Sequence, residues 1–232
     1  MPLPGPLKNL FRGGRGSQPP NGPGGAPQSR SRGGARGDEV ISVRQSRGLE
    51  EFFTYIRDQS GLTILDLGGA TQQNVSFITN LGHRLYSEDF LQILRETFGE
   101  DGSAEQTSTG QIDYFLRQAL DYPEGHFDGV LVWDVLEYLG PALLPAVVER
   151  LRTIVRPKSY MLAFFHADDK LESAPYYTFR IQELNTLQVA QQGARRPAQL
   201  YNNRSLEKLF GKYESVKFFL TRERLREVII KV

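Results

Sequence analysis

From about residue 38 onward, short apolar runs alternate with helical repeats of apolar residues. Continuous apolar runs, typical of strands covered on both faces, predict strands at residues 62–67, 127–134 and 160–165, and 83–87 is a further candidate strand. Apolar residues three or four positions apart, typical of amphipathic helices, predict helices at residues 49–56, 75–81, 90–98 and 143–154. Strands that alternate with helices indicate crossover units and a mostly parallel sheet.

The carboxyl-terminal part follows a different pattern. Residues 177–181 and 186–189 alternate with period two and predict a strand pair, and a short helix is expected at 205–210. Residues 216–220 and 225–232 flank a turn and predict a hairpin. The expected fold class is therefore α/β, a doubly wound, mostly parallel sheet with helices on both faces and an antiparallel C-terminal hairpin.

Residues 100–126 fit this scheme least well. A polar insert, EDGSAEQTSTG, precedes the segment QIDYFLRQALDYPEGH, which is compatible with either a short strand or a helix. The sequence therefore does not place a third strand.

Residues 1–37 differ in composition from the rest of the chain. They consist mainly of glycine, proline, serine, glutamine and arginine, and cannot bury enough apolar surface to offset the entropy of ordering. We expect a disordered tail followed by one folded domain over residues 38–232. The tail holds six basic and no acidic residues (+6), so the remainder carries −5 of the net charge of +1. The two Arg-Gly-Gly triplets of the tail could bind RNA or another polyanion. The alternative is a solubilising segment, which the near absence of aromatic residues for base stacking favours, since Phe11 is the only one in the tail.

The composition also bounds the chemistry. The chain has no cysteine, which excludes disulfides, thiolate chemistry and zinc held by sulfur. Its three histidines, His83, His126 and His166, speak against a histidine-built metal site. No apolar run approaches the roughly 20 residues needed to cross a bilayer, and the amino terminus lacks an apolar signal region. We expect a soluble, cytoplasmic protein that uses neither a metal nor a membrane.

Acidic residues follow three of the predicted strands, at the edge where open α/β sheets bind ligands. They are Asp66, Glu88-Asp89, and Asp134 with Glu137. Gly68 and Gly69 allow a ligand to approach the backbone, and Glu88 lies 20 residues beyond Gly68, where an acid that holds ribose hydroxyls is expected. The chain lacks G-x-G-x-x-G and G-K-[ST], and acidic strand ends repel pyrophosphate. The pattern favours a nucleoside without phosphate that carries a cation and an amino acid moiety.

These segments resemble the class I S-adenosylmethionine-dependent methyltransferases. The resemblance rests on Leu65-Asp66-Leu67-Gly68, on the acid at 88 and above all on FDGVLVWDVLEYL at residues 127–139. This last segment looks like the family's F-D-x-V-x-x-x-x-V-L-E-H-L region, with Tyr138 where many members have histidine. Residues 155–159 resemble the family's L-x-P-G-G turn without its glycines. The resemblance implies a Rossmann-like fold, S-adenosyl-L-methionine as cofactor, and methyl transfer to an acceptor that we expect to be a small molecule.

The glycine turn departs from the family pattern. D-x-G-x-G-x-G becomes Asp66, Gly68, Ala70 and Gln72, so only the first glycine is kept. Alanine at 70 adds one methyl group, which is tolerated where φ is negative. Gln72 either occupies the space of the methionine portion or donates a hydrogen bond to its carboxylate.

The resemblance also implies roles for the residues that bind the cofactor. In the turn formed with Gly68, Gly69 and Ala70, Asp66 would organise the loop and contact the methionine amine. Glu88, or Asp89 one residue further on, would accept hydrogen bonds from the ribose hydroxyls. Further candidates are Asp113 near the adenine amino group, and Trp133 and Asp134 beside the sulfonium.

Methyl transfer depends mainly on alignment of two reactants, and a base helps when the acceptor is a hydroxyl or an amine. Tyr138 and His166 are the candidate bases. Three of the candidate residues also have a plainer interpretation: Trp133 as a core residue, His166 as a solvated loop residue, and Glu137 as a partner of a helix amide. Two rival functions follow: a methyltransferase fold retained as a non-catalytic binding module, and an RNA-tethered modifying enzyme.

Overall fold

The computed structural model describes residues 41–99, 106–168, 171–221 and 225–232. The chain divides into two units, Met1–Gly37 and Asp38–Val232, and all described residues belong to the second. The predicted disordered tail and its possible contact with nucleic acid therefore lie outside the described residues.

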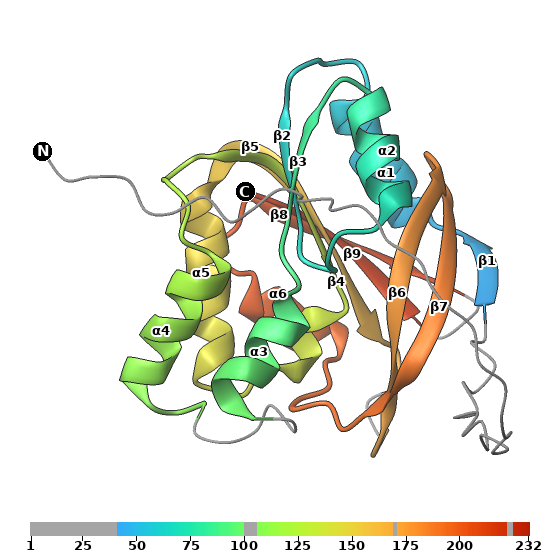
Figure 1. Ribbon diagram of the computed structural model, residues 1–232. Coiled ribbons are helices and arrows are strands. Elements are labelled where there is room, and N and C mark those ends of the chain that lie inside the picture. The colour runs from blue at the N-terminus through green and yellow to red at the C-terminus, as the bar shows by residue number, and fades with distance from the viewer. Residues whose placement is uncertain (1–40, 100–105, 169–170, 222–224) are drawn as a thin grey trace, which may run out of the picture. The chain divides into compact units, whose positions relative to one another are not determined.

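A six-stranded sheet forms the centre of the folded unit (Figure 1). Its strands, in spatial order, are β3 (Arg84–Ser87), β2 (Thr63–Asp66), β4 (Phe127–Trp133), β5 (Val155–His166), β9 (Leu225–Lys231) and β8 (Ser215–Leu220). The first four are parallel, whereas β9 runs antiparallel to β5 and β8 antiparallel to β9. This arrangement confirms the predicted fold class, including the closing hairpin.

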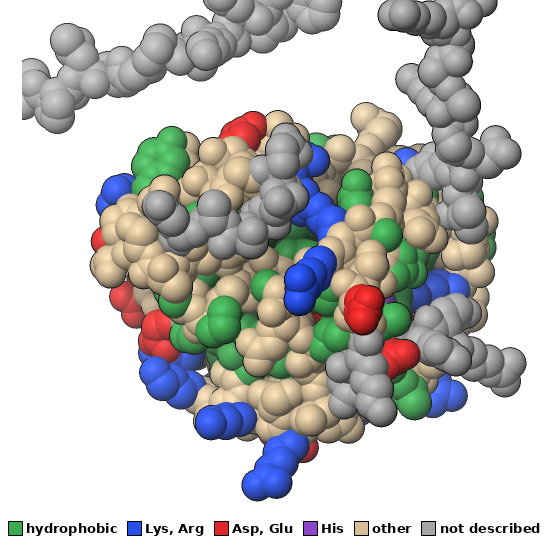
Figure 2. Space-filling model, turned by 90° about the horizontal axis from the view of Figure 1, so that it is seen from below, with side chains coloured by type: hydrophobic (Ala, Val, Ile, Leu, Met, Phe, Trp, Pro, Cys, Tyr) green, Lys and Arg blue, Asp and Glu red, His purple; other side chains and the backbone are tan. Residues whose placement is uncertain are grey.

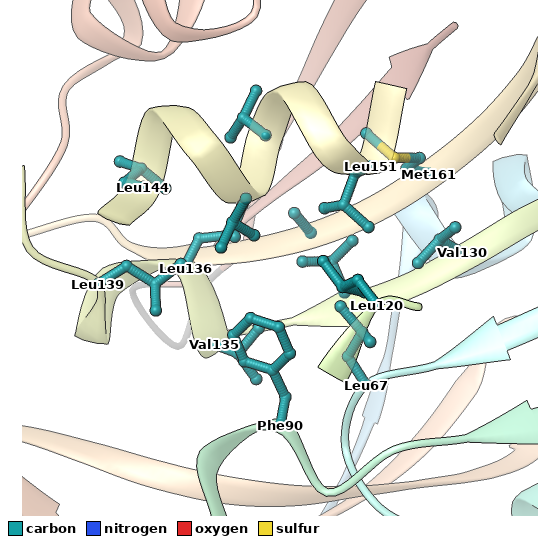
Figure 3. Packing of buried hydrophobic residues seen from close by; sticks show 14 of the residues in the cluster. Leu67, Phe90, Leu120, Val130, Val135, Leu136, Leu139, Leu144, Leu151 and Met161 are labelled. Carbon is teal, nitrogen blue, oxygen red and sulfur yellow. The ribbon is translucent and has the colours of Figure 1, made fainter. Parts of the chain in front are cut away.

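Helices cover both faces of the sheet. On one face lie α3 (Phe90–Phe98), α4 (Thr109–Ala119), α5 (Leu143–Ile154) and α6 (Asn203–Leu209). Figure 3 shows part of the core on this face, with Phe90, Leu120, Leu151 and Met161 pointing toward one another from different elements. On the other face lie α1 (Arg47–Ile56) and α2 (Gln72–Asn80), whose apolar residues join a second core cluster. β4 is apolar along almost its whole length because it is buried between the two layers.

The segment that the sequence left open forms α4 rather than a third strand. Phe115 and Ala119, four positions apart, are its buried residues, and Ile112 and Leu116 pack partly against the same core. In the described residues, β3 is therefore followed by two helices before β4.

The strand pair predicted at 177–181 and 186–189 is present as β6 (Ala174–Glu183) and β7 (Thr186–Arg195). It belongs to a separate antiparallel sheet with the order β1-β7-β6, in which β1 (Ile41–Gln45) is a strand that the sequence pattern did not predict. The inner residues of this sheet join the core cluster that contains α1 and α2. The small sheet is thus a structural layer on that face of the main sheet.

No helix in the described parts of the chain is long and apolar enough to cross a membrane. The same parts contain no group of three or more histidine, aspartate or glutamate side chains placed to hold a metal ion.

Candidate functional site

The turn after β2 brings the glycine loop next to the end of β3. Gly69 has a φ of 82°, a left-handed conformation that glycine adopts without strain. Its amide donates to the Glu88 carbonyl at 3.0 Å, and Gly68 pairs with Asp89 across an isolated bridge. Gly68 and Ala70 are exposed. The sequence prediction that the glycine turn and Glu88 meet at one edge of the sheet agrees with this geometry.

Asp66 lies at the end of β2 and is fully buried. Its carboxylate accepts three hydrogen bonds: from Trp133 Nε1 at 2.6 Å, from the Gly68 amide at 2.8 Å and from Asn74 Nδ2 at 2.9 Å. Burial raises the pKa of Asp66, and the three donors act in the opposite direction by stabilising the charged form. Asp66 therefore organises the loop, as the resemblance implies, but its hydrogen-bond partners come from within the chain.

Trp133 lies at an irregularity in β4, where the pairing with β5 shifts between Leu131 and Trp133. Its φ is 56°, which is rare for a residue other than glycine. The indole ring lies against Gly68, where a Cβ atom would be only 2.7 Å from Trp133 Cδ1. On its other side the ring stacks on Phe179 of β6, with ring centroids 5.0 Å apart and planes 6° apart. The side chain is 1% exposed, so the structure places Trp133 in the core at the strand end.

Gln72 points along the surface of α2 and not into the interior. It is exposed, and its Nε2 donates to Ser76 Oγ at 3.0 Å along α2. The inward position belongs instead to Asn74, which sequence analysis did not single out. Its Nδ2 also donates to the Phe179 carbonyl at 3.1 Å, and its Oδ1 accepts from the Ile181 amide at 2.8 Å. Asn74 thereby fixes β6 to the start of α2 and to the Asp66 loop.

The acids after β3 have different surroundings. Glu88 is half-buried, and its Oε1 accepts a hydrogen bond from the Tyr122 hydroxyl. Asp89 is exposed and caps α3, with its Oδ1 accepting from the Gln92 amide at 2.9 Å. Of the two alternatives for a ribose contact, Glu88 is the one whose side chain is not used by a helix cap. Asp113 is exposed on α4, so no strand end presents it.

A buried polar cluster lies at the ends of β4 and β5. Glu137 is fully buried in the short 3₁₀ helix Val135–Tyr138 and binds His166 twice, accepting from its amide at 2.9 Å and contacting its Nδ1 at 2.5 Å. Burial works against a charged His166, but Glu137, together with the charge of Asp134 and the Pro175 carbonyl, outweighs it and raises the pKa of His166. Asp134 is 2% exposed, and burial, assisted by the nearby Glu137, raises its pKa to about 7.

Several polar atoms of this cluster make no hydrogen bond with the described part of the chain. They are Asp134 Oδ2, the Tyr138 hydroxyl, His166 Nε2 and the Tyr201 hydroxyl. Burial, followed by the charges of Asp134 and Glu137, raises the pKa of Tyr138, which keeps its hydroxyl protonated. The structure thus brings Tyr138 and His166 together with Asp134, at 5%, 4% and 2% exposure. Because the Tyr138 hydroxyl stays protonated, His166 is the better candidate base of the two.

The strand β6 lies over this edge of the sheet. Phe179 stacks on Trp133, Ile181 binds Asn74 through its amide, and the Tyr177 ring lies 6.3 Å from the His166 ring. These three β6 residues alternate along the strand and share its inner side. Trp133, Asn74 and His166 therefore lie beneath β6, whereas the cofactor candidates Gly68, Ala70 and Asp89 are exposed.

A cavity of about 500 Å³ lies elsewhere, between α5 and α6. It is lined mainly by apolar side chains, among them Leu144, Val148 and Leu209, and contains none of the predicted site residues. On the face shown in Figure 2, lysine and arginine side chains are spread among other side chains.

Comparison with known proteins identifies the family. A family model described as a methyltransferase domain matches residues 40–214. No curated protein matches the chain. Similar solved structures include the 1,6-didemethyltoxoflavin-N1-methyltransferase of Burkholderia thailandensis, with 12% identity, a TM-score of 0.44 and coverage of 79% of this chain and 76% of that one.

A second similar structure is an S-adenosylmethionine-dependent methyltransferase from Archaeoglobus fulgidus, with 14% identity, a TM-score of 0.46 and coverage of 79% and 92%. A third is a putative O-methyltransferase from Nostoc punctiforme, with 9% identity, a TM-score of 0.47 and coverage of 79% and 55%. Because the family model spans most of the folded unit, the chain belongs to the methyltransferase-domain family.

Proposed function

We propose that the protein is a class I S-adenosylmethionine-dependent methyltransferase of the cytoplasm that acts on a small-molecule acceptor. Family membership supports methyl transfer. The observation that carries the proposal is the pairing of the Gly69 turn with Glu88: a left-handed glycine, an exposed backbone and a half-buried carboxylate meet at the carboxyl edge of a parallel sheet.

The residues present fit the two halves of the cofactor unequally. The nucleoside half fits, because Glu88 can accept from two ribose hydroxyls and Gly68 and Ala70 leave the neighbouring backbone exposed. The amino-acid half fits poorly, since the Asp66 oxygens are already bound by Trp133, Gly68 and Asn74. Binding of the whole cofactor therefore requires an exchange of internal hydrogen bonds for ligand hydrogen bonds.

When bound, the cofactor supplies the methyl group. The chain supplies the surroundings of the acceptor: Glu137 holds the His166 ring by its Nδ1, and Nε2 makes no well-formed hydrogen bond with the described residues, although the Pro175 carbonyl interacts with the ring. An imidazole held in this way can take a proton from a hydroxyl or an amine once it is neutral. Asp134, with a pKa of about 7, lies close enough to interact electrostatically with His166 and can itself exchange a proton near neutral pH.

Calorimetric titration with S-adenosylhomocysteine tests this proposal. We expect measurable binding that weakens about tenfold or more in Glu88→Ala, because a charge-assisted hydrogen bond is worth about 1.5–3 kcal/mol. Asp113→Ala should leave the affinity unchanged, since Asp113 lies exposed on α4. An absence of heat at millimolar ligand, or an unchanged affinity in Glu88→Ala, would contradict the assignment.

A second function is favoured by one specific observation, the hydrogen bond from Trp133 Nε1 to Asp66, which uses the Asp66 carboxylate within the chain. In this alternative the fold is a non-catalytic binding module in which the glycine loop packs against the core and holds no cofactor. It predicts a melting temperature that does not respond to S-adenosylmethionine or its product, whereas a ligand at 100 times its Kd stabilises the folded state by about 2.7 kcal/mol.

A further inference from the structure

We propose that Trp133 occupies the place of the cofactor's amino-acid end, so that a nucleoside enters the site directly whereas S-adenosylmethionine enters only when the indole side chain is displaced. This inference rests on the proposed function, because it assumes that the edge between Gly68 and Glu88 binds a nucleoside. It adds the residue that decides how much of such a ligand the site accepts.

The indole takes both the space and the polar partner of an amino-acid end. Its ring lies against Gly68 so closely that a Cβ atom there would collide at 2.7–2.9 Å, so the glycine makes room for Trp133. Its Nε1–H donates to Asp66 Oδ1 at 2.6 Å, the hydrogen bond that a ligand ammonium group would otherwise make. Trp133 therefore acts as an internal substitute for the ligand's donor.

The ring is held firmly in this position. It stacks on Phe179 at 5.0 Å and meets Phe164 edge-on at 5.6 Å. Phe179 is fixed in turn, because its carbonyl accepts from Asn74 at 3.1 Å. The φ of 56° at Trp133 is a strained value that persists only where the surroundings enforce it.

Rotation of β6 away from the edge is not an easy alternative. Phe179, Ile181, Leu187 and Val189 of the small sheet are all at most 4% exposed and belong to one core cluster. Exposure of several large apolar side chains consumes much of the stability of an ordinary domain. A ligand with an amino-acid tail must therefore displace the Trp133 side chain itself.

The nucleoside end is free of this obstacle. Gly68, Ala70 and Asp89 are exposed, and Glu88 is half-buried. The Tyr122 hydroxyl binds only Oε1 of Glu88 in the described structure, and Tyr122 is a neutral donor that ribose hydroxyls can replace. Adenosine can thus approach Glu88 without moving Trp133.

The test compares two ligands on three proteins by calorimetry, with adenosine and S-adenosylhomocysteine as probes. For the unaltered protein we expect adenosine to bind at least as tightly as S-adenosylhomocysteine. In Trp133→Ser the affinity for S-adenosylhomocysteine should rise about 100-fold, equivalent to about 2.7 kcal/mol, while adenosine affinity changes less than threefold. Trp133→Phe is the control, because it removes the indole donor and part of the ring volume but keeps an aromatic ring in the space, so its preference should stay with adenosine.

Each outcome separates the inference from the proposed function. If the unaltered protein binds S-adenosylhomocysteine ten times more tightly than adenosine, the role of Trp133 is overturned and the methyltransferase assignment stands. If neither probe binds any of the three proteins, the proposed function fails and the selectivity with it.

Fluorescence supplies a readout that needs no variant. Trp133 is the only tryptophan in the chain, so its emission reports directly on its own displacement. Saturation with S-adenosylhomocysteine should shift the emission to the red, whereas saturation with adenosine should not. An unchanged emission with bound S-adenosylhomocysteine would overturn the inference even if Trp133→Ser does not fold.

Discussion

Replacement of Asn74 by alanine is the change that tests most directly how the site is held together. Asn74 is 1% exposed and joins three separate segments with a single amide group. It binds Asp66 Oδ2, the Phe179 carbonyl and the Ile181 amide at 2.9, 3.1 and 2.8 Å. Asn74→Ala removes all three hydrogen bonds without removing any of the groups that they satisfy.

The size of the effect follows from what remains buried. A buried polar group that loses its partner costs about 1–3 kcal/mol, and more when it is charged. The variant leaves two backbone groups and one carboxylate oxygen in this state, so we expect a loss of about 3–6 kcal/mol in the free energy of unfolding. That is a large share of the roughly 5–15 kcal/mol that stabilises a typical domain.

Urea unfolding followed by Trp133 fluorescence and by circular dichroism measures this loss. Gln72→Ala is the matched control, since Gln72 lies in the same helix but is exposed, and a change within about 0.5 kcal/mol is expected there. Asn74→Asp should be worse than Asn74→Ala at neutral pH, because it places a second carboxylate beside Asp66, and should recover as the pH falls. A loss below about 1 kcal/mol for Asn74→Ala would refute the view that this amide holds β6 in place.

Three further predictions concern the acids and the histidine of the site. The pKa of Asp134 is about 7 in the folded state and 3.8 ordinarily. The contribution of this group to stability is therefore full below about pH 4 and is lost as the pH rises to 7. Asp134→Asn should stabilise the protein by up to about 4 kcal/mol at pH 8 and change its stability little at pH 4, which thermal unfolding at both pH values measures. Because the pKa of His166 is raised in the folded state, its stabilising contribution is full below the ordinary pKa of 6.5 and is lost as the pH rises through the pKa of the folded state. Glu137→Gln should lower the pKa of His166, which an NMR titration measures. Asp89→Ala should cost about 1 kcal/mol of stability, because α3 loses its cap, and should leave the affinity for adenosine unchanged. Glu88→Ala should weaken adenosine binding. Weaker adenosine binding in Asp89→Ala but not in Glu88→Ala would assign the ribose contact to Asp89.

The alternating framework was predictable from the sequence because its physical cause is local. β4 is buried from both sides and so carries an almost unbroken apolar run, FDGVLVW. Gly82 and Gly99, which follow two helices, have φ values of 84° and 86° in the structure, the conformation for which glycine is chosen. α4 was also within reach, because Phe115 and Ala119 have the spacing of one helical face.

β1 was missed because its pattern is inverted. Its apolar residues Ile41 and Val43 are 49% and 60% exposed, whereas Arg44 is 6% exposed. The guanidinium of Arg44 lies over the rings of Phe164 and Phe179, at 5.4 and 5.8 Å from their centroids. A cation–π contact of this kind depends on tertiary packing and leaves no alternation of apolar and polar residues to read.

The interior of the candidate site was equally inaccessible from the sequence. The position of Trp133 depends on a bulge and on a positive φ, neither of which residue types specify. The importance of Asn74 depends on bonds to residues 105 and 107 positions away. The sequence pattern placed the candidate acids at this edge of the sheet. Trp133 from β4 and Asn74 from α2 fill the space there and are held by β6, whose place the strand pattern alone did not determine.

The acidic side chains at this edge of the sheet can bind either donors within the chain or donors of a ligand, and the two kinds of hydrogen bond compete. Asp66 is held by Trp133 and Asn74, and Glu137 by His166, so each of these carboxylates already has the donors that make burial of its charge tolerable. A ligand therefore gains only the difference between its own hydrogen bonds and the internal ones that it replaces, and the net gain at Asp66 is small. Asp134 differs, because its Oδ2 has no hydrogen bond with the described chain, and a donor that reaches it removes a cost instead of exchanging a bond. Binding energy in this site should thus come mainly from the acceptor side at Asp134 and from the nucleoside side at Glu88, with the Asp66 loop acting as scaffold between them.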